Sequence, residues 1–181
     1  MDFLLPTGEF RIYNRIMKVS AQEEYGLRCL LQMARNSDAG SLSIPEISRA
    51  EGLSGPNVAK LMRILRLGGL VRSVRGKSGG YRLARAADRV TIEQVLRVLG
   101  RPAYGPHFCA RHAGIEDDCP HKGDCAMRPV WRKIQEMMSA ILTNTTLQDL
   151  LRSEEEMKDW LAGIDFAGGN GKKALSRATA V

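Results

Sequence analysis

The sequence lacks long apolar runs, a leader-like N-terminus and an abundance of aromatic residues. No apolar run approaches the roughly 20 residues that a membrane-spanning helix needs, and no basic region precedes a short apolar core at the N-terminus. Aromatic residues make up 6% of the 181 residues, which is little for an all-β sandwich and ordinary for a helical protein. We therefore expect a mainly helical, cytoplasmic protein of one or two domains, with no secretion signal and no membrane partner.

Cysteine is also scarce, and its distribution excludes the commonest thiol motif. The sequence has four cysteines and no Cys-x2-Cys pair. In a chain without a secretion signal, this cysteine content argues against a disulfide framework and for metal or redox chemistry. The sequence also has no phosphate-binding glycine loop and no combination of nucleophile and base. We expect neither an enzyme nor a small-molecule substrate, and a thiol oxidoreductase or cluster carrier is the disfavoured alternative.

Positive charge is concentrated in one segment. The whole chain has a net charge of +7, whereas residues 60–89 alone carry +8, because nine basic residues accompany the single acid Asp88. The basic residues of this segment are Lys60, Arg63, Arg66, Arg72, Arg75, Lys77, Arg82, Arg85 and Arg89. This charge density favours a polyanionic partner.

The order of predicted elements is that of a winged helix-turn-helix. Helical periodicity, capping boxes and strand-like segments predict helices at 21–36, 43–51 and 54–67, strands at 70–74 and 81–84, and further helices at 91–99 and 129–143. The fold class is therefore mainly α with a small β wing: a winged helix-turn-helix domain plus a long helix. The expected parts are an N-terminal extension 1–16, a DNA-binding domain 17–90, a short helix with a cysteine-rich loop 91–128, a long helix with a final turn 129–151, and a disordered tail 152–181.

Side chains near the start of the third helix and on the wing are the candidate DNA contacts. Small residues at the start of that helix would let its N-terminus approach a groove, and its free N–H groups suit a phosphate. Asn57 is a candidate base reader, although any exposed polar residue early in this helix would look the same. Cations at the wing tip would reach the DNA backbone or the minor groove. The candidate residues are Ser54, Asn57, Lys60, Arg75, Lys77 and Tyr81.

Three cysteines and all three histidines lie within 19 residues. Cys109, Cys119 and Cys125 are spaced Cys-x9-Cys-x5-Cys, in a segment kept irregular by glycine and proline. Thiolates suit an iron–sulfur cluster or zinc. Zinc sites usually show tighter cysteine pairs, so the spacing favours a cluster and keeps zinc, or inert cysteines, as alternatives. Cys29 lies on or beside an apolar helical stripe and is interpreted as a small core residue.

The order of these features resembles the IscR/NsrR/RirA-type family of iron–sulfur transcription regulators. The resemblance covers about residues 17–151, and it is most specific in the wing motif Val-Arg-Gly-x-x-Gly-Gly-Tyr-x-Leu from Val74 to Leu83 and in the three-cysteine loop before Pro129. It implies a homodimer built on the long helix that binds palindromic promoter DNA, with one cluster per subunit held by the three cysteines. The interface residues would be Val130, Ile134, Met137, Met138 and Ile141.

Two departures leave the fourth ligand and the cluster type open. The first cysteine spacing is longer than is usual in the family, and Arg128 stands where IscR-like members have a histidine. NsrR-like members use an acid in the first helix of the partner subunit, and Glu24 occupies the matching position. The alternatives are a loop histidine, namely His107, His112 or His121, or else water or a small molecule. Glu24 would then simply pair with Arg28. The cluster is either 2Fe–2S or 4Fe–4S.

The preferred function is a regulator of transcription that senses iron–sulfur, redox or nitric-oxide status, and a repressor is the expected mode. The alternative is a zinc-bound or metal-free winged-helix regulator that responds to thiol oxidation.

Overall fold

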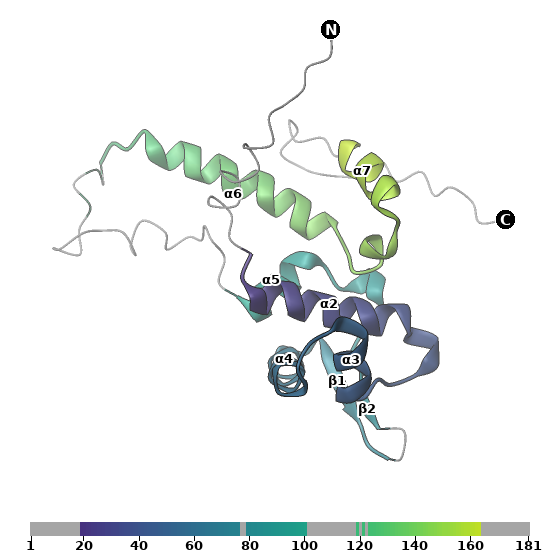
Figure 1. The fold of residues 1–181 in the computed structure, drawn as a ribbon. Coiled ribbons are helices and arrows are strands. Elements are labelled where there is room, and N and C mark those ends of the chain that lie inside the picture. The colour runs from purple at the N-terminus through teal and green to yellow at the C-terminus, as the bar shows by residue number, and fades with distance from the viewer. Residues whose placement is uncertain (1–18, 77–78, 101–118, 120, 122, 164–181) are drawn as a thin grey trace, which may run out of the picture.

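A computed structural model describes residues 19–76, 79–100, 119, 121 and 123–163. Within these residues the chain is mostly helical with one small antiparallel sheet, as predicted. In Figure 1 the long helix α6 (Met127–Asn144) lies above helix α2 (Ala21–Arg35), and the hairpin of the two strands lies at the opposite end of the molecule. Among the described residues, no helix combines the length and apolar character that crossing a membrane requires.

The first three described helices begin at signals that are visible in the sequence. Helices α2 and α3 (Ile44–Glu51) both open with a complete capping box, Ser20 with Glu23 and Ser43 with Glu46. Helix α4 (Gly55–Leu67) begins after Ser54, whose side chain makes no capping hydrogen bond, and has Pro56 in its first turn. The three helices contact one another pairwise and form the helix-turn-helix bundle.

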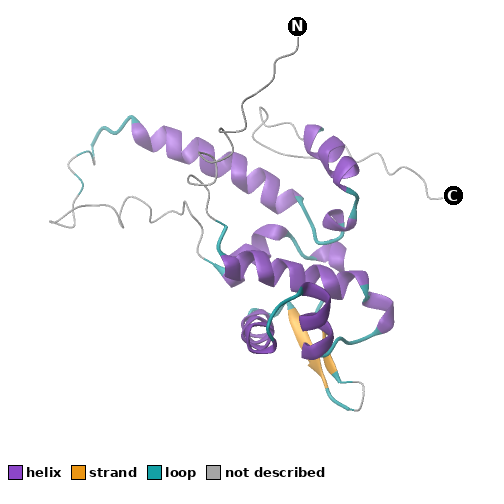
Figure 2. Cartoon of the chain, in the orientation of Figure 1, coloured by secondary structure: helices purple, strands orange, loops and turns teal. Residues whose placement is uncertain are grey.

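The wing consists of strands β1 (Val71–Val74) and β2 (Gly80–Leu83), drawn in orange in Figure 2. They pair antiparallel, with Val71 opposite Leu83 and Val74 opposite Gly80. The free edge of β2 is covered by Leu42, which exchanges two backbone hydrogen bonds with Tyr81. Gly80 fits here because a Cβ would lie 2.3 Å from the Leu42 carbonyl oxygen.

One hydrophobic core joins the helix-turn-helix to the elements that follow it. Helix α5 (Ile92–Leu99) packs against α2, α4 and α6. After α6, the chain returns to this domain: Leu147 is fully buried, and its N–H donates to the Val90 carbonyl at 2.9 Å. The fully buried side chains are Leu30, Ile47, Leu61, Met62, Leu65, Leu70, Leu99, Leu147, Val58, Val90, Val95 and Cys29. The C-terminal end of α6 is therefore attached to the helix-turn-helix unit.

The chain after residue 152 differs from the predicted disordered tail. A short 3-10 turn, η4 (Asp149–Leu151), is followed by helix α7 (Glu154–Ala162). Ser153 and Glu156 form a third capping box, and Lys158 lies 3.0 Å from Glu154, so local interactions stabilise a helix that buries none of its residues. The rest of the predicted tail, and the extension 1–16, lie outside the described residues.

Candidate nucleic-acid interface and cysteine segment

The turn between α3 and α4 is short and is held by local hydrogen bonds. Helix α3 ends at Gly52, which has φ 64° and so adopts the left-handed conformation that glycine tolerates. The Leu53 N–H donates to the Ser48 carbonyl at 3.1 Å, and the Ser48 hydroxyl donates back to the Leu53 carbonyl. This geometry sets the angle at which α4 leaves the turn, as a helix-turn-helix requires.

Arg28 attaches the turn to helix α2. Its Nε donates to Glu51 Oε2 at 3.0 Å and its Nη2 donates to the Glu51 carbonyl at 2.6 Å. The hydrogen bond to Glu51 raises the pKa of Arg28 above its usual value. Arg28 therefore forms its hydrogen-bonded ion pair with Glu51, and the expected attraction to Glu24 is present as a weaker electrostatic contribution.

The start of α4 is open to an anion. Its first turn holds no acidic residue, and Ser54 is exposed. Lys60 is exposed and Asn57 is half-buried, whereas the buried stripe of the same helix faces the core. The free N–H groups of the first turn, together with the positive end of the helix dipole, favour a negatively charged ligand. The contacts of these side chains with DNA remain predictions.

The described part of the wing presents one cation at its tip. Arg75 is exposed, and the tight turn places Gly76 at φ 115° with the Gly79 N–H donating to its carbonyl at 2.9 Å. Lys77 lies outside the described residues. Tyr81 is half-buried and packs against the core, so it also holds the wing on the helices. A DNA contact of Tyr81 stays a prediction.

Two of the three clustered cysteines lie just before α6. Cys119 and Cys125 are free thiols of intermediate exposure, and His121 is exposed, with its carbonyl accepting from Arg128 at 3.4 Å. Cys109, His107 and His112 lie outside the described residues. Within the described ranges, no three metal-ligating side chains come together. Free thiols at this place suit the soft iron of a cluster or zinc, and a complete ligand set would have to include residues beyond the described ones.

Cys29 is separate from this segment, as predicted. It is 0% exposed within the core, and burial raises the pKa of its thiol to about 11. A neutral, enclosed thiol is a poor ligand and a poor nucleophile.

Glu24 is exposed in the first turn of α2. The neighbouring Gln22 side chain donates to the carbonyl of Leu99, the last residue of α5. The first turn of α2 is thereby tied to the chain two residues before the undescribed segment starts at 101. Glu24 as a ligand remains a prediction.

Helix α6 leaves an apolar face uncovered. None of its residues is buried in the single chain, and Val130 and Met137 are 55% and 41% exposed. Ile134, Met138 and Ile141 are half-buried. An 18-residue helix with large exposed apolar side chains is typical of an association surface.

Sequence reasoning missed two features of this interface. Arg72 and Arg82 appeared only as members of the basic segment, although they are direct partners across the wing strands. The alternation of side chains along a strand indicates which residues share a face. Without the pairing register it does not show that Arg72 and Arg82 lie opposite each other. The bond between Arg28 and Glu51 had no local signal at all.

Comparison with known proteins agrees with this geometry. Residues 19–153 match the model of the Rrf2 family, described as an iron-dependent transcriptional regulator. The HTH-type transcriptional regulator CymR of Bacillus subtilis is 33% identical over 134 residues, which cover 74% of this chain and 89% of CymR. The HTH-type transcriptional regulator IscR of Escherichia coli strain HS is 29% identical over 139 residues, 77% of this chain and 83% of IscR.

Solved structures show the same arrangement. The structure of CymR from B. subtilis, named the global cysteine regulator, gives a TM-score of 0.63 at 30% identity and covers 75% of this chain and 96% of CymR. The structure of T. potens IscR gives a TM-score of 0.61 at 29% identity and covers 76% of this chain and 88% of IscR. Both structures therefore resemble the fold of about three quarters of this chain.

Proposed function

The chain belongs to the Rrf2 family of transcriptional regulators, and from this premise we propose that it is a homodimeric repressor whose DNA affinity depends on an iron–sulfur cluster held by Cys109, Cys119 and Cys125. As a member of this family it is a DNA-binding regulator and not an enzyme. The observation that carries the proposal is the position of Cys119 and Cys125. Both thiols are free and partly exposed, and Cys125 lies two residues before the helix that would offer an apolar face for dimerisation.

In this proposal, the recognition helix α4, the wing and the long helix α6 each have a separate role in DNA binding. The open N-terminus of α4 would enter the major groove, with Asn57 at base edges and Ser54 and Lys60 near phosphates. Arg75 and Lys77 would contact the backbone or the adjacent minor groove, next to Tyr81. Two such units, related by the dimer axis at α6, would bind half-sites about one helical turn apart.

The cluster would communicate with the DNA-binding unit through α2. Glu24 of the partner subunit is the proposed fourth ligand, since it is exposed in α2. The first turn of this helix is hydrogen-bonded to Leu99, shortly before the cysteine segment. A carboxylate is a hard ligand among soft thiolates, so this position would be the most labile one. His121, which is also exposed, is the alternative ligand within the segment, together with His107 and His112.

A second candidate function follows from the relatives. CymR carries the name of a cysteine regulator, and this chain is 33% identical to it. The same fold could therefore act without a cluster, as a thiol-responsive or zinc-bound regulator. The two candidates share DNA binding and differ in what the cysteines hold.

Anaerobic purification followed by visible absorption spectroscopy, with iron and sulfide analysis, tests the proposal. We expect broad iron–sulfur charge-transfer bands, their loss in Cys119→Ala and Cys125→Ala, and their retention in the matched control Cys29→Ala. A colourless protein that contains zinc, or no metal, would select the second candidate. Glu24→Ala and His121→Ala then assign the fourth ligand, because only the variant that lacks a true ligand should decay faster in air.

A further inference from the structure

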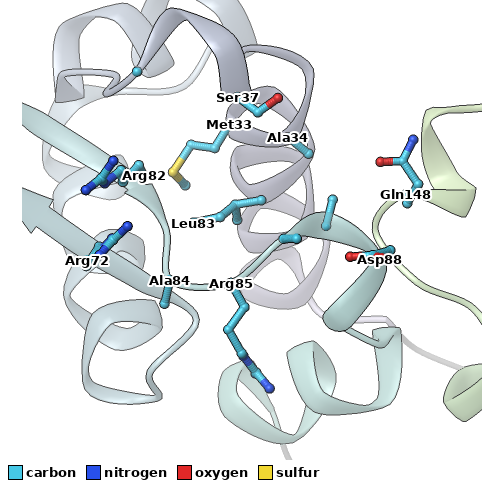
Figure 3. Close-up of a pocket in the computed structure, with 13 residues that line it drawn as sticks. Met33, Ala34, Ser37, Arg72, Arg82, Leu83, Ala84, Arg85, Asp88 and Gln148 are labelled. Atoms are coloured by element: carbon cyan, nitrogen blue, oxygen red, sulfur yellow. The ribbon is translucent and has the colours of Figure 1, made fainter.

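Two arginines occupy directly opposite positions on the strands of the wing. In the register of β1 and β2, Arg72 is the cross-strand partner of Arg82. Successive side chains of a strand point to opposite faces, so both arginines lie on the face away from the buried Val71. Both are exposed, and Figure 3 shows their side chains next to each other on the same side of the strands.

This arrangement places two positive charges where a sheet usually avoids them. Like charges directly opposite each other across a strand pair are destabilising. Among the described residues, no carboxylate forms an ion pair with either arginine. Other arginines nearby do have partners: Arg89 lies 4.0 Å from Asp88, and Arg85 donates to Gln94 at 3.3 Å. An anion from outside would relieve the repulsion within the pair.

The surroundings leave room for such an anion. The pair lies at the edge of an open groove of about 570 Å³ that is also lined by Met33, Leu83 and Arg85. Asp88 is the one carboxylate among its described lining residues, and its charge is opposed by Arg89. The groove is open and both arginines are exposed, so a single small anion would be held weakly here. An extended polyanion, which gains from many contacts and from counterion release, fits an exposed site better.

We propose that Arg72 and Arg82 together bind the phosphate backbone of double-stranded DNA on the strands of the wing, away from its tip. This inference rests on the proposed DNA-binding function and extends it to residues outside the recognition helix and the wing tip. Guanidinium groups form paired hydrogen bonds with phosphate oxygens, which suits two arginines that share one face. The strand that carries Arg72 leads to Arg75, so phosphate contacts would continue along the wing. The pair would position the protein without reading sequence.

Salt-dependent binding of a random-sequence duplex of about 30 base pairs, roughly three helical turns, tests this inference. The variant is Arg72→Gln with Arg82→Gln. The matched control is Arg89→Gln with Arg97→Gln, which removes the same charge from two arginines that already pair with acids. The pair variant should bind about tenfold more weakly at low salt and show a salt slope shallower by about one to two. The control should stay close to wild type.

A second variant separates DNA binding from folding. Arg82→Glu converts the like-charged pair into an opposite-charged one with Arg72, so it should raise the melting temperature while it lowers duplex affinity. An unchanged slope in the double variant, or wild-type affinity in Arg82→Glu, would overturn the inference. Stabilisation of wild type but not of the double variant by millimolar inorganic phosphate, with equal duplex slopes, would assign the pair to a small anion and also overturn it. Failure of wild type itself to bind duplex at low salt would instead overturn the proposed function.

Discussion

Gly26 of helix α2 lies directly against Leu99 of helix α5, so closely that a Cβ at residue 26 would be 2.5 Å from Leu99 Cδ1. Both residues are buried, and Leu99 precedes the segment that leads to the cysteines. The contact brings α2, which supports the turn of the helix-turn-helix, close to the residue that lies just before the cysteine segment. A substitution at Gly26 therefore tests directly how tightly α2 and α5 are packed.

Gly26→Ala should destabilise the protein. Forcing a methyl group into a filled core costs about 1–3 kcal/mol, partly offset by about 1 kcal/mol gained in helix propensity, so we expect a net loss of roughly 1 kcal/mol in the free energy of unfolding. In the background Leu99→Ala, which itself costs about 2–5 kcal/mol, the same change should become neutral or stabilising because space is open. Chemical denaturation measures both effects, and additive changes would contradict the described contact.

The recognition helix and the wing tip should make different contributions to DNA binding. Arg75→Ala should weaken specific and random DNA alike and lower the salt slope by about one, because it removes a phosphate contact. Asn57→Ala should instead reduce discrimination between operator and random DNA, by about 1–3 kcal/mol if it contacts a base. Fluorescence anisotropy over a salt series measures both. Equal losses of discrimination in the two variants would argue against this division.

The cysteines should fall into two reactivity classes. Burial raises the pKa of the Cys29 thiol from 9.0 to about 11, so at pH 8 only about one molecule in a thousand carries its thiolate. Iodoacetamide should label Cys119 and Cys125 of the cluster-free protein within minutes and leave Cys29 unlabelled until denaturant is added. Mass spectrometry of the alkylated protein measures this.

The same pKa shift has a consequence for stability. The pKa of Cys29 is higher in the folded than in the unfolded chain, so its contribution is complete below pH 9 and is lost as the pH rises through about 11. The variant Cys29→Ala should lose less stability over this interval than wild type does.

In the labelling experiment, rapid labelling of Cys29 in the native protein at pH 8 would show that the core is not packed as described.

The exposed apolar face of α6 should hold the dimer together. Met137→Glu and Val130→Glu place a charge on side chains that are 41% and 55% exposed in the single chain, so they should be tolerated by the fold and should disrupt association. Lys133→Glu is the matched control, on an exposed residue of the same helix whose ammonium lies 3.8 Å from Glu136. Sedimentation equilibrium should show monomers for the first two variants and a dimer for the control. Intact dimers in all three would place the interface elsewhere.

Much of the fold could be predicted because its signals are local. The capping boxes at Ser20 and Ser43 mark helix starts in four residues, and the apolar stripe of α4 identifies its buried face. The box at Ser153 was equally local, but the polar composition of α7 concealed it. The Arg28–Glu51 bond and the Arg72–Arg82 pair could not be predicted, because each depends on a contact between separate elements. The cysteine spacing favoured a cluster but did not specify the fourth ligand.

The most direct test of the central claim is the dissociation constant for an operator recovered by in vitro selection, measured on one anaerobic preparation before and after its cluster is removed. We expect the cluster-bearing and cluster-free dimers to differ at least tenfold in this constant, which corresponds to about 1.4 kcal/mol of coupling between the cysteine segment and α4. Equal dissociation constants for the two forms would contradict the proposal that the cluster controls the affinity of the protein for DNA.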